Sequence, residues 1–258
     1  MGVTQTIKKL DNIHFFAKEV MKRVDNVKID VLILNAGTNT SDINIHTSDG
    51  FETVFAINHI ANYLLIRLLL PYMAEGSIIV ITMSGTHDPA ERSIIPPPKH
   101  ADALLLAHPE NDNALDIDPK INAGRAYSSS KLCNILTARF LITDTIVKAN
   151  KIKIVAYDPG LTPGTDLVRY HNFVIHFVWK VLSLNLFRVF IPHMNSCKAS
   201  GETLADIAQG IIQLPEDRFY AALRKGKITW PSPSELALND QVMEKLWKDS
   251  AKLVGLSE

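Results

Sequence analysis

Tyr127 and Lys131, four residues apart, are the pair in this sequence whose types and spacing indicate chemistry most directly. The pair leads into the helical apolar pattern of Leu132, Ile135 and Leu136, and positions i and i+4 of a helix lie on one face. Because a nearby ammonium favours the phenolate, we expect Lys131 to lower the pKa of Tyr127 and make it a proton donor or acceptor near neutral pH. An ordinary pair on a helix surface has the same spacing. The surrounding elements therefore have to distinguish a catalytic pair from a surface pair.

Short apolar runs alternate with helical patterns along the chain. The runs predict strands, the first of them buried on both faces, and the patterns between them predict helices. The strands are predicted at 29–34, 77–82 and 153–157, and the helices at 7–21, at 50–73 and at a third segment that Tyr127 and Lys131 open. This alternation predicts an α/β fold, a doubly wound parallel sheet with helices on both faces.

Polar groups follow each predicted strand. They are Asn35-Ala36-Gly37, the segment from Thr82 to Ser84, and Asp158-Pro159-Gly160. Ligands of open parallel sheets bind beyond the carboxyl ends of the strands, so these groups and the Tyr127 helix are expected to share one crevice. A serine hydroxyl beside a reactive tyrosine would polarise a carbonyl; the alternative for Ser84 is a hydroxyl that caps a loop.

The composition is that of a globular protein without a nucleic-acid surface. The 258 residues include 27 Lys and Arg against 27 Asp and Glu, so the net charge is zero and no basic excess indicates nucleic acid. The two cysteines, Cys133 and Cys197, suit a reducing compartment. The N-terminus shows no apolar signal core. We therefore expect a cytoplasmic protein.

Together these motifs resemble the short-chain dehydrogenase/reductase family, closest to its branch of light-dependent protochlorophyllide reductases and retinol dehydrogenases. The resemblance covers nearly the whole chain. It rests on Asn35-Ala36-Gly37, Asn58-His59, Ser84-Gly85, Tyr127 to Asn134 and Pro159-Gly160, and on the C-terminal segment from Lys245 to Leu256. It implies a Rossmann-like fold and an NADP-linked oxidoreductase.

The resemblance also implies roles for individual residues. Tyr127 would protonate the substrate, and Lys131 would lower the tyrosine pKa and hold the nicotinamide ribose. Ser84, or Thr82 in the alternative register, would polarise the substrate, and Asn58 would anchor a proton-relay water. The cofactor would further contact Asn35, Ala36, Gly37, Pro159 and Gly160.

One departure from the family concerns the cofactor. The glycine-rich turn that receives the pyrophosphate at a helix N-terminus does not occur in this sequence. Thr6 stands where the family has an adenine-contacting aspartate, so the sequence resembles an N-terminally truncated member without the first strands. We expect NADP(H) to bind weakly or not at all. Leu161 replaces the cysteine after the Pro-Gly turn, which argues against protochlorophyllide reduction itself.

The chain is predicted to form one domain, residues 1–258, with two unusual segments. Residues 87–124 are polar and proline-rich and predict a surface excursion. Residues 163–195 are apolar and would form a lid over a large apolar substrate by resemblance; a core helix or a peripheral membrane contact are the alternatives. His59, His87 and His100 have no metal-ligand spacing, and no metal is expected.

Three functions are compatible with these residues and motifs. The first is an enzyme with a Ser/Tyr/Lys centre that acts on a carbonyl or conjugated group of a large apolar substrate. The second is a cofactor-independent isomerase, cyclase or lyase on the same scaffold, and the third is a non-catalytic partner protein. Without the first strands, the strand at 29–34 would become a sheet edge. We expect a second copy or another protein to cap that edge.

Overall fold

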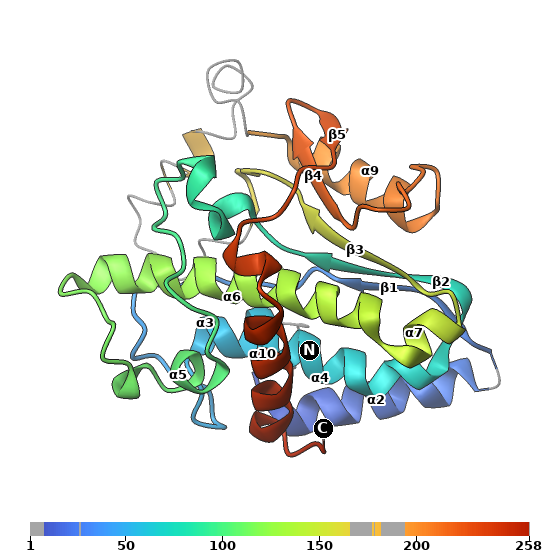
Figure 1. The fold of residues 1–258 in the computed structure, drawn as a ribbon, viewed down its shortest axis with the longest axis horizontal. Helices are drawn as coiled ribbons and strands as arrows, with labels where there is room; N and C mark the ends of the chain where they lie inside the picture. The colour runs from blue at the N-terminus through green and yellow to red at the C-terminus, as the bar shows by residue number, and fades with distance from the viewer. Residues whose placement is uncertain (1–7, 26, 166–176, 178, 182–193, 258) are drawn as a thin grey trace.

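The computed structural model describes residues 8–25, 27–165, 177, 179–181 and 194–257 (Figure 1). Its centre is a five-stranded sheet in the spatial order β1-β2-β3-β4-β5. The strands are β1 Ile29–Leu34, β2 Met73–Thr82, β3 Lys153–Asp158, β4 Tyr220–Arg224 and β5 Lys227–Thr229. Strands β1 to β4 pair in parallel and β5 pairs antiparallel to β4. The predicted parallel α/β architecture is therefore confirmed.

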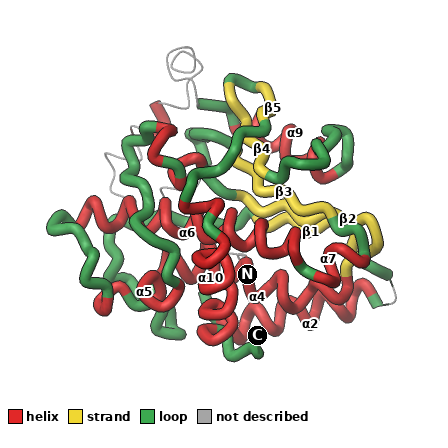
Figure 2. Tube along the Cα trace, in the orientation of Figure 1, coloured by secondary structure: helices red, strands yellow, loops and turns green. Residues whose placement is uncertain are grey.

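Helices cover both faces of the sheet (Figures 1 and 2). The α-helices are α2 Leu10–Val24, α3 Thr53–Phe55, α4 Ala61–Leu69, α5 Ala103–Ala107, α6 Pro119–Thr143, α7 Thr145–Ala149, α9 Cys197–Ala208 and α10 Asp240–Leu253. The other helical turns are η1 Ala56–Ile60, η2 Leu70–Tyr72, η3 Gly85–His87, η4 Pro89–Glu91, η5 Pro109–Asn111 and η8 Leu236–Leu238. Successive residues of a strand point to opposite faces. Accordingly, Ile79 and Ile81 of β2 join the large core with α4, α6 and α10, whereas Ile78 and Val80 join the core beneath α9.

The helix predicted at 50–73 is a continuous helical stretch that changes its hydrogen-bonding pattern. It passes from α3 through the π-helical turn η1 into α4 and ends in the 3-10 turn η2, which contains Pro71. The stretch Thr53–Tyr72 is long and apolar enough to cross a membrane, yet 83% of its most apolar window is buried inside the protein. It is packed as the central helix of a core.

The prediction that strand 29–34 is buried on both faces is wrong. Val31 and Ile33 keep 39% and 41% of their surface exposed, and Leu34 is the one fully buried residue of β1. The reason is position: within the described residues β1 is the edge of the sheet. On this face α9 packs over β2, β3 and β4 and leaves these two side chains uncovered.

Residues 87–124 form a more structured segment than a surface excursion. Ala103 and Ala107 of α5 are fully buried in the main core. The segment also ends earlier than predicted, because α6 already begins at Pro119, where the Asp118 side chain accepts a hydrogen bond from the backbone N–H of Lys120 (2.9 Å). Aspartate before a proline in the first turn is a common helix start. Most of the segment 163–195 lies outside the described residues.

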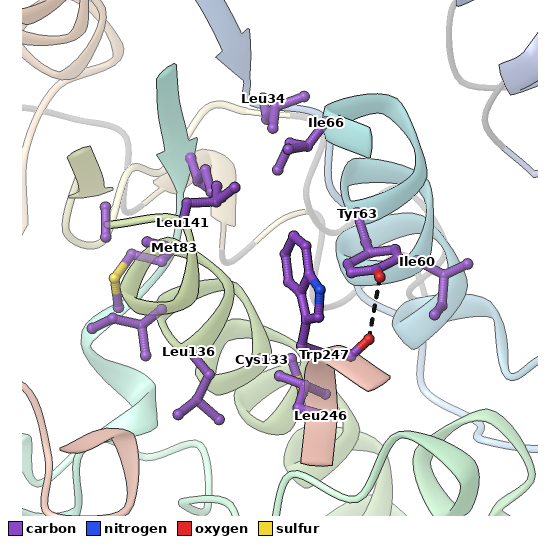
Figure 3. Packing of buried hydrophobic residues seen from close by; sticks show 14 of the residues in the cluster. Leu34, Ile60, Tyr63, Ile66, Met83, Cys133, Leu136, Leu141, Leu246 and Trp247 are labelled. Atoms are coloured by element: carbon purple, nitrogen blue, oxygen red, sulfur yellow. Dashed lines mark hydrogen bonds between the residues drawn. The ribbon is translucent and has the colours of Figure 1, made fainter. Parts of the chain in front are cut away.

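Helix α10 closes the main core through Trp247 (Figure 3). The indole stacks on Phe140 of α6 with 4.0 Å between ring centroids and meets the edge of Tyr63 of α4 at 4.8 Å. The Tyr63 hydroxyl donates a hydrogen bond to the Trp247 carbonyl (3.2 Å). The C-terminal helix thus holds α4 and α6 against each other; α6 carries candidate site residues, and α4 continues the helical stretch that carries Asn58.

Candidate active site

Tyr127 and Lys131 lie inside α6, not at its start as predicted, because the helix begins two turns earlier at Pro119. Both side chains are nearly out of contact with solvent, with 6% and 4% of their surfaces exposed. The Lys131 ammonium lies 5.7 Å from the centroid of the Tyr127 ring. The structure therefore excludes the ordinary exposed surface pair, and the two residues form a buried pair.

Lys131 connects α6 to the carboxyl end of β2. Its Nζ donates to the backbone carbonyl of Thr82 (3.2 Å), and the Asn134 amide donates to the same oxygen (3.3 Å). Burial lowers the pKa of Lys131 to about 8, and the negative charge of Asp158 opposes this effect. An ammonium with such a pKa exchanges its proton near neutral pH.

The expectation that Lys131 lowers the pKa of Tyr127 is not supported. Burial raises the pKa of the Tyr127 phenol above its ordinary value, a hydrogen bond with Ser84 lowers it in part, and the charge of Asp158 raises it further. The physical reason is that Lys131 points to the Thr82 carbonyl, while a buried phenol loses the water that would solvate its anion. Tyr127 is therefore a protonated phenol near neutral pH.

Ser84 is the hydroxyl whose interaction with Tyr127 lowers the pKa of the phenol in part. It lies directly beyond β2, where it precedes η3 and accepts a long hydrogen bond from the backbone N–H of Thr86 (3.4 Å). The hydroxyl of Thr82, the alternative register, instead donates to the side-chain oxygen of Asn35 (2.9 Å). Geometry thus favours Ser84 as the tyrosine's partner and makes Thr82 a link between the ends of β1 and β2.

Asn58 lies in the π-helical turn η1 and is fully buried. Its side-chain oxygen accepts from the backbone N–H of Thr38 (2.7 Å), and its amide donates to the Thr38 carbonyl (3.0 Å) and to Ser130 Oγ (2.9 Å). Ser130 donates in turn to the Tyr127 carbonyl (2.7 Å). Asn58 therefore fixes the loop after β1 against the helix of Tyr127. Single π-turns inside helices are rare and occur often at functional sites.

The residues predicted to contact the cofactor lie just beyond the carboxyl ends of β1 and β3, beside Asn58 and Lys131. Asn35 and Ala36 are exposed just beyond β1. A Cβ atom on Gly37 would lie 3.3 Å from Asn58 Oδ1 and 3.5 Å from Lys131 Nζ, so glycine keeps this space open. Gly160 has a φ of 70° and donates its N–H to Asp158 Oδ1 (2.9 Å), and the Pro159 carbonyl accepts from Asn195 (3.0 Å).

Sequence reasoning missed the charged cluster beside these residues. Asp158, with 3% of its side chain exposed, pairs with Arg224 of β4 (2.8 Å), which also pairs with Glu91 of η4 (2.8 Å). The strand β4 itself was not predicted, because Ala221 and Ala222 lack the branched side chains that indicate a strand. The signal available was Asp158 itself, an acidic residue directly after a buried apolar strand.

Several known proteins are similar in sequence to this chain. A family model described as "short chain dehydrogenase" matches residues 1–94. Retinol dehydrogenase 12 of Bos taurus is 28% identical over 97% of this chain and 70% of its own length. A chloroplastic protochlorophyllide reductase of Daucus carota is 25% identical over 96% of this chain and 63% of its own length. The chain therefore resembles the short-chain dehydrogenase family, most directly over residues 1–94.

Solved structures show the same fold as this chain. A putative uncharacterized protein from Mycobacterium paratuberculosis superposes with a TM-score of 0.59 at 21% identity, covering 97% of this chain and 74% of the other. An NADPH-bound carbonyl reductase from chicken fatty liver gives 0.51 at 18% identity, with 81% and 68% covered. The predicted Rossmann-like fold is thereby confirmed, and the family match over residues 1–94 and the named relatives support the predicted family and its oxidoreductase class. The chain spans less than two thirds of some relatives, such as the Daucus carota reductase.

The residues of the candidate site fit the nicotinamide end of a dinucleotide. Within the described residues, Lys131 donates one hydrogen bond to Thr82, and an ammonium has three donors, so a ribose hydroxyl can take another. Gly37 keeps the approach to Lys131 and Asn58 free of a side chain. For the pyrophosphate end, the described residues contain no glycine-rich strand-to-helix turn.

Proposed function

We propose that this protein is a reductase or dehydrogenase that transfers a proton through Tyr127 to or from the oxygen of a carbonyl or conjugated group. The observation that carries the proposal is that Tyr127, Lys131 and Ser84 gather at the end of β2, where Lys131 donates to the Thr82 carbonyl and Ser84 acts on the pKa of Tyr127. Asn58, in the turn η1, fixes the loop after β1 against the helix of Tyr127. An ordinary structural core does not require four polar side chains to be gathered at the carboxyl ends of parallel strands.

The chemistry of each side chain follows from its surroundings. As a protonated phenol, Tyr127 donates from Oη to the substrate oxygen, while Ser84 Oγ hydrogen-bonds the same oxygen and stabilises its developing charge. Lys131, with a pKa of about 8, can supply a proton to the phenolate that remains near neutral pH. A bound nicotinamide cofactor of the NADP(H) type would supply the hydride. Lys131 and the backbone around Gly37 would hold its ribose, and the affinity is expected to be low.

The substrate is proposed to be large and apolar. Two relatives are named for retinol and for protochlorophyllide, both extended conjugated molecules. Leu161 follows the Pro159-Gly160 turn, where the protochlorophyllide reductases have a cysteine, which argues for a retinoid-like aldehyde or alcohol over a tetrapyrrole.

The experiment is a reductase assay with all-trans-retinal and a high concentration of NADPH, followed by the loss of NADPH absorbance. Tyr127→Phe should abolish turnover because the proton-donating hydroxyl is lost. The native circular dichroism should be kept because nothing else in the side chain changes. Tyr72→Phe, at a partly exposed tyrosine outside the site, is the matched control and should retain full activity. Full activity of Tyr127→Phe would overturn the proposal. Conversion of the substrate without NADPH oxidation would instead favour a cofactor-independent isomerase or lyase.

A further inference from the structure

The backbone carbonyl of Thr82 is the point where the helix α6 meets the end of the strand β2. Thr82 is the last residue of β2, and the pairing with β1 ends one residue earlier, between Leu34 and Ile81. The carbonyl beyond this ladder accepts two side-chain donors from α6, Lys131 Nζ at 3.2 Å and Asn134 Nδ2 at 3.3 Å. Lys131 therefore shares its acceptor with Asn134, a residue that has no part in the proposed proton transfer.

Asn134 is buried as deeply as the lysine. It is 1% exposed and Lys131 is 4% exposed, and positions i and i+3 of a helix lie on one face, so both side chains reach the same oxygen. Asn134 also acts on the fully buried His59 of η1: burial lowers the pKa of this imidazole to about 3, and Asn134 raises it in part. His59, which hydrogen-bonds Ser250 Oγ through Nε2 (2.9 Å), is therefore neutral and places no charge beside the amide of Asn134.

Two donors use both lone pairs of the Thr82 carbonyl, because a carbonyl oxygen has two. The Asn134 amide takes one of them and leaves the other to the Lys131 ammonium. A Cβ atom on Gly37 would lie 3.5 Å from Lys131 Nζ and 3.3 Å from Asn58 Oδ1. The ammonium therefore lies on the side of the loop after β1, where the ribose of a cofactor is expected.

We propose that Asn134 is a positioning residue, which occupies one lone pair of the Thr82 carbonyl and thereby directs the Lys131 ammonium toward Gly37 and the ribose of a bound cofactor. The proposal rests on the proposed function, because it assigns the orientation of the lysine in that site. An ammonium carries three rotatable donors on a flexible stem, so one acceptor with two open lone pairs does not hold it in a single orientation. Without the amide of Asn134, Lys131 can move to the vacated lone pair and away from Gly37.

The alternative is a structural amide that uses the nearest carbonyl only to satisfy its own N–H. The Thr82 carbonyl does not require this second donor, because Lys131 already donates to it and one partner satisfies a buried carbonyl. A structural amide would contribute to the stability of the fold but would leave the orientation of Lys131 unchanged. The two roles therefore differ in what the lysine side chain does when the amide is removed.

The test follows the Lys131 side chain directly, without turnover. The full chain is labelled with ¹³C at lysine Cε, and the Lys131 signal is assigned from its loss in Lys131→Arg. An ammonium held in one orientation gives the two Hε protons different chemical shifts, whereas exchange between two positions averages them. We expect separate Hε shifts in the native protein. Asn134→Leu, which keeps the size of the side chain and removes its donor, should lose most of this separation.

Asn122→Leu is the matched control. Asn122 is another buried asparagine of α6, and its side chain makes two hydrogen bonds, with the backbone N–H and carbonyl of Asp116 (2.7 and 2.8 Å). This variant loses buried hydrogen bonds but leaves the Thr82 carbonyl unchanged, so it should keep the separation of the Hε shifts.

Three results would overturn the proposal: averaged Hε shifts in the native protein, a retained separation in Asn134→Leu, or an equal loss of separation in Asn134→Leu and Asn122→Leu. If Asn134→Leu does not fold, Asn134→Ala is measured in its place, because it removes the same donor without adding bulk, and the same results decide.

The reductase assay gives a second readout. With all-trans-retinal, Asn134→Leu should raise the KM for NADPH about tenfold, the lower end for loss of a hydrogen bond from a charged donor, and should change kcat less. A native KM in this variant would overturn the proposal. If the native protein oxidises no NADPH while the Hε shifts behave as expected, the reductase function is refuted and the role of Asn134 in orienting Lys131 stands.

Discussion

Replacing Asn58 by alanine tests whether the π-helical turn holds the loop after β1 in place. The substitution removes both hydrogen bonds with Thr38, at 2.7 and 3.0 Å, and the one to Ser130 at 2.9 Å. Ser130 keeps its bond to the Tyr127 carbonyl, whereas the N–H and C=O of the fully buried Thr38 lose the partners that Asn58 provides. An unsatisfied buried polar group costs about 1–3 kcal/mol. We therefore expect Asn58→Ala to lower the free energy of unfolding by about 2–6 kcal/mol, a large part of the ~5–15 kcal/mol of a typical domain.

The assay is urea denaturation followed by far-UV circular dichroism, with the free energy obtained by linear extrapolation. Asn150→Ala is the matched control, because its amide makes a single exposed hydrogen bond to the Ile146 carbonyl (2.9 Å). It should cost less than about 1 kcal/mol. Equal losses for the two variants, or a loss below about 1 kcal/mol for Asn58→Ala, would refute the reasoning that Asn58 satisfies otherwise unpaired backbone groups.

Three further predictions concern the core, a buried acid and the sheet edge. Trp247→Ala should lower the free energy of unfolding by about 3–5 kcal/mol in the same assay, whereas Phe15→Ala, at a side chain 65% exposed, should have little effect. Similar losses of stability in the two variants would contradict the packing described for α10. Burial raises the pKa of Glu52 to about 7, so the folded state binds this proton more tightly than the unfolded chain does. The stability that the protonated carboxyl provides below pH 4.5 is therefore lost as the pH rises through 7, by about 3 kcal/mol. Glu52→Gln should remove this loss between about pH 5 and 8, and an unchanged pH dependence would exclude Glu52 as its source. We propose that β1 is capped by a second copy of the chain or by another protein. If a second copy caps it, Ile33→Lys should lower the mass found by sedimentation equilibrium, whereas Ile142→Lys, on α6, should not. A monomeric wild-type chain would exclude capping by a second copy.

The sequence by itself determined the main elements and which residues gather at the candidate site. Apolar runs favour strands of a parallel sheet, which is why β1, β2 and β3 lie where the runs predicted them. Polar residues directly after such runs must lie at the carboxyl ends of parallel strands. For this reason Ser84 could be placed beside the Tyr127 helix from the order of the residues alone.

Only the tertiary structure decided how these groups are charged and supported. Whether Lys131 or Asp158 shifts the pKa of Tyr127 depends on burial and on the direction of each side chain. The spacing of residues along a helix gives information on neither. The partner that holds Asp158, Arg224, comes from a short alanine-containing strand 66 residues further along the chain. The exposure of Val31 was likewise decided by the described neighbours of β1 and not by its own apolar sequence. A side chain's electrostatic environment is the sum of contacts distant in sequence, so the same residues could be named from the sequence but not assigned their protonation states.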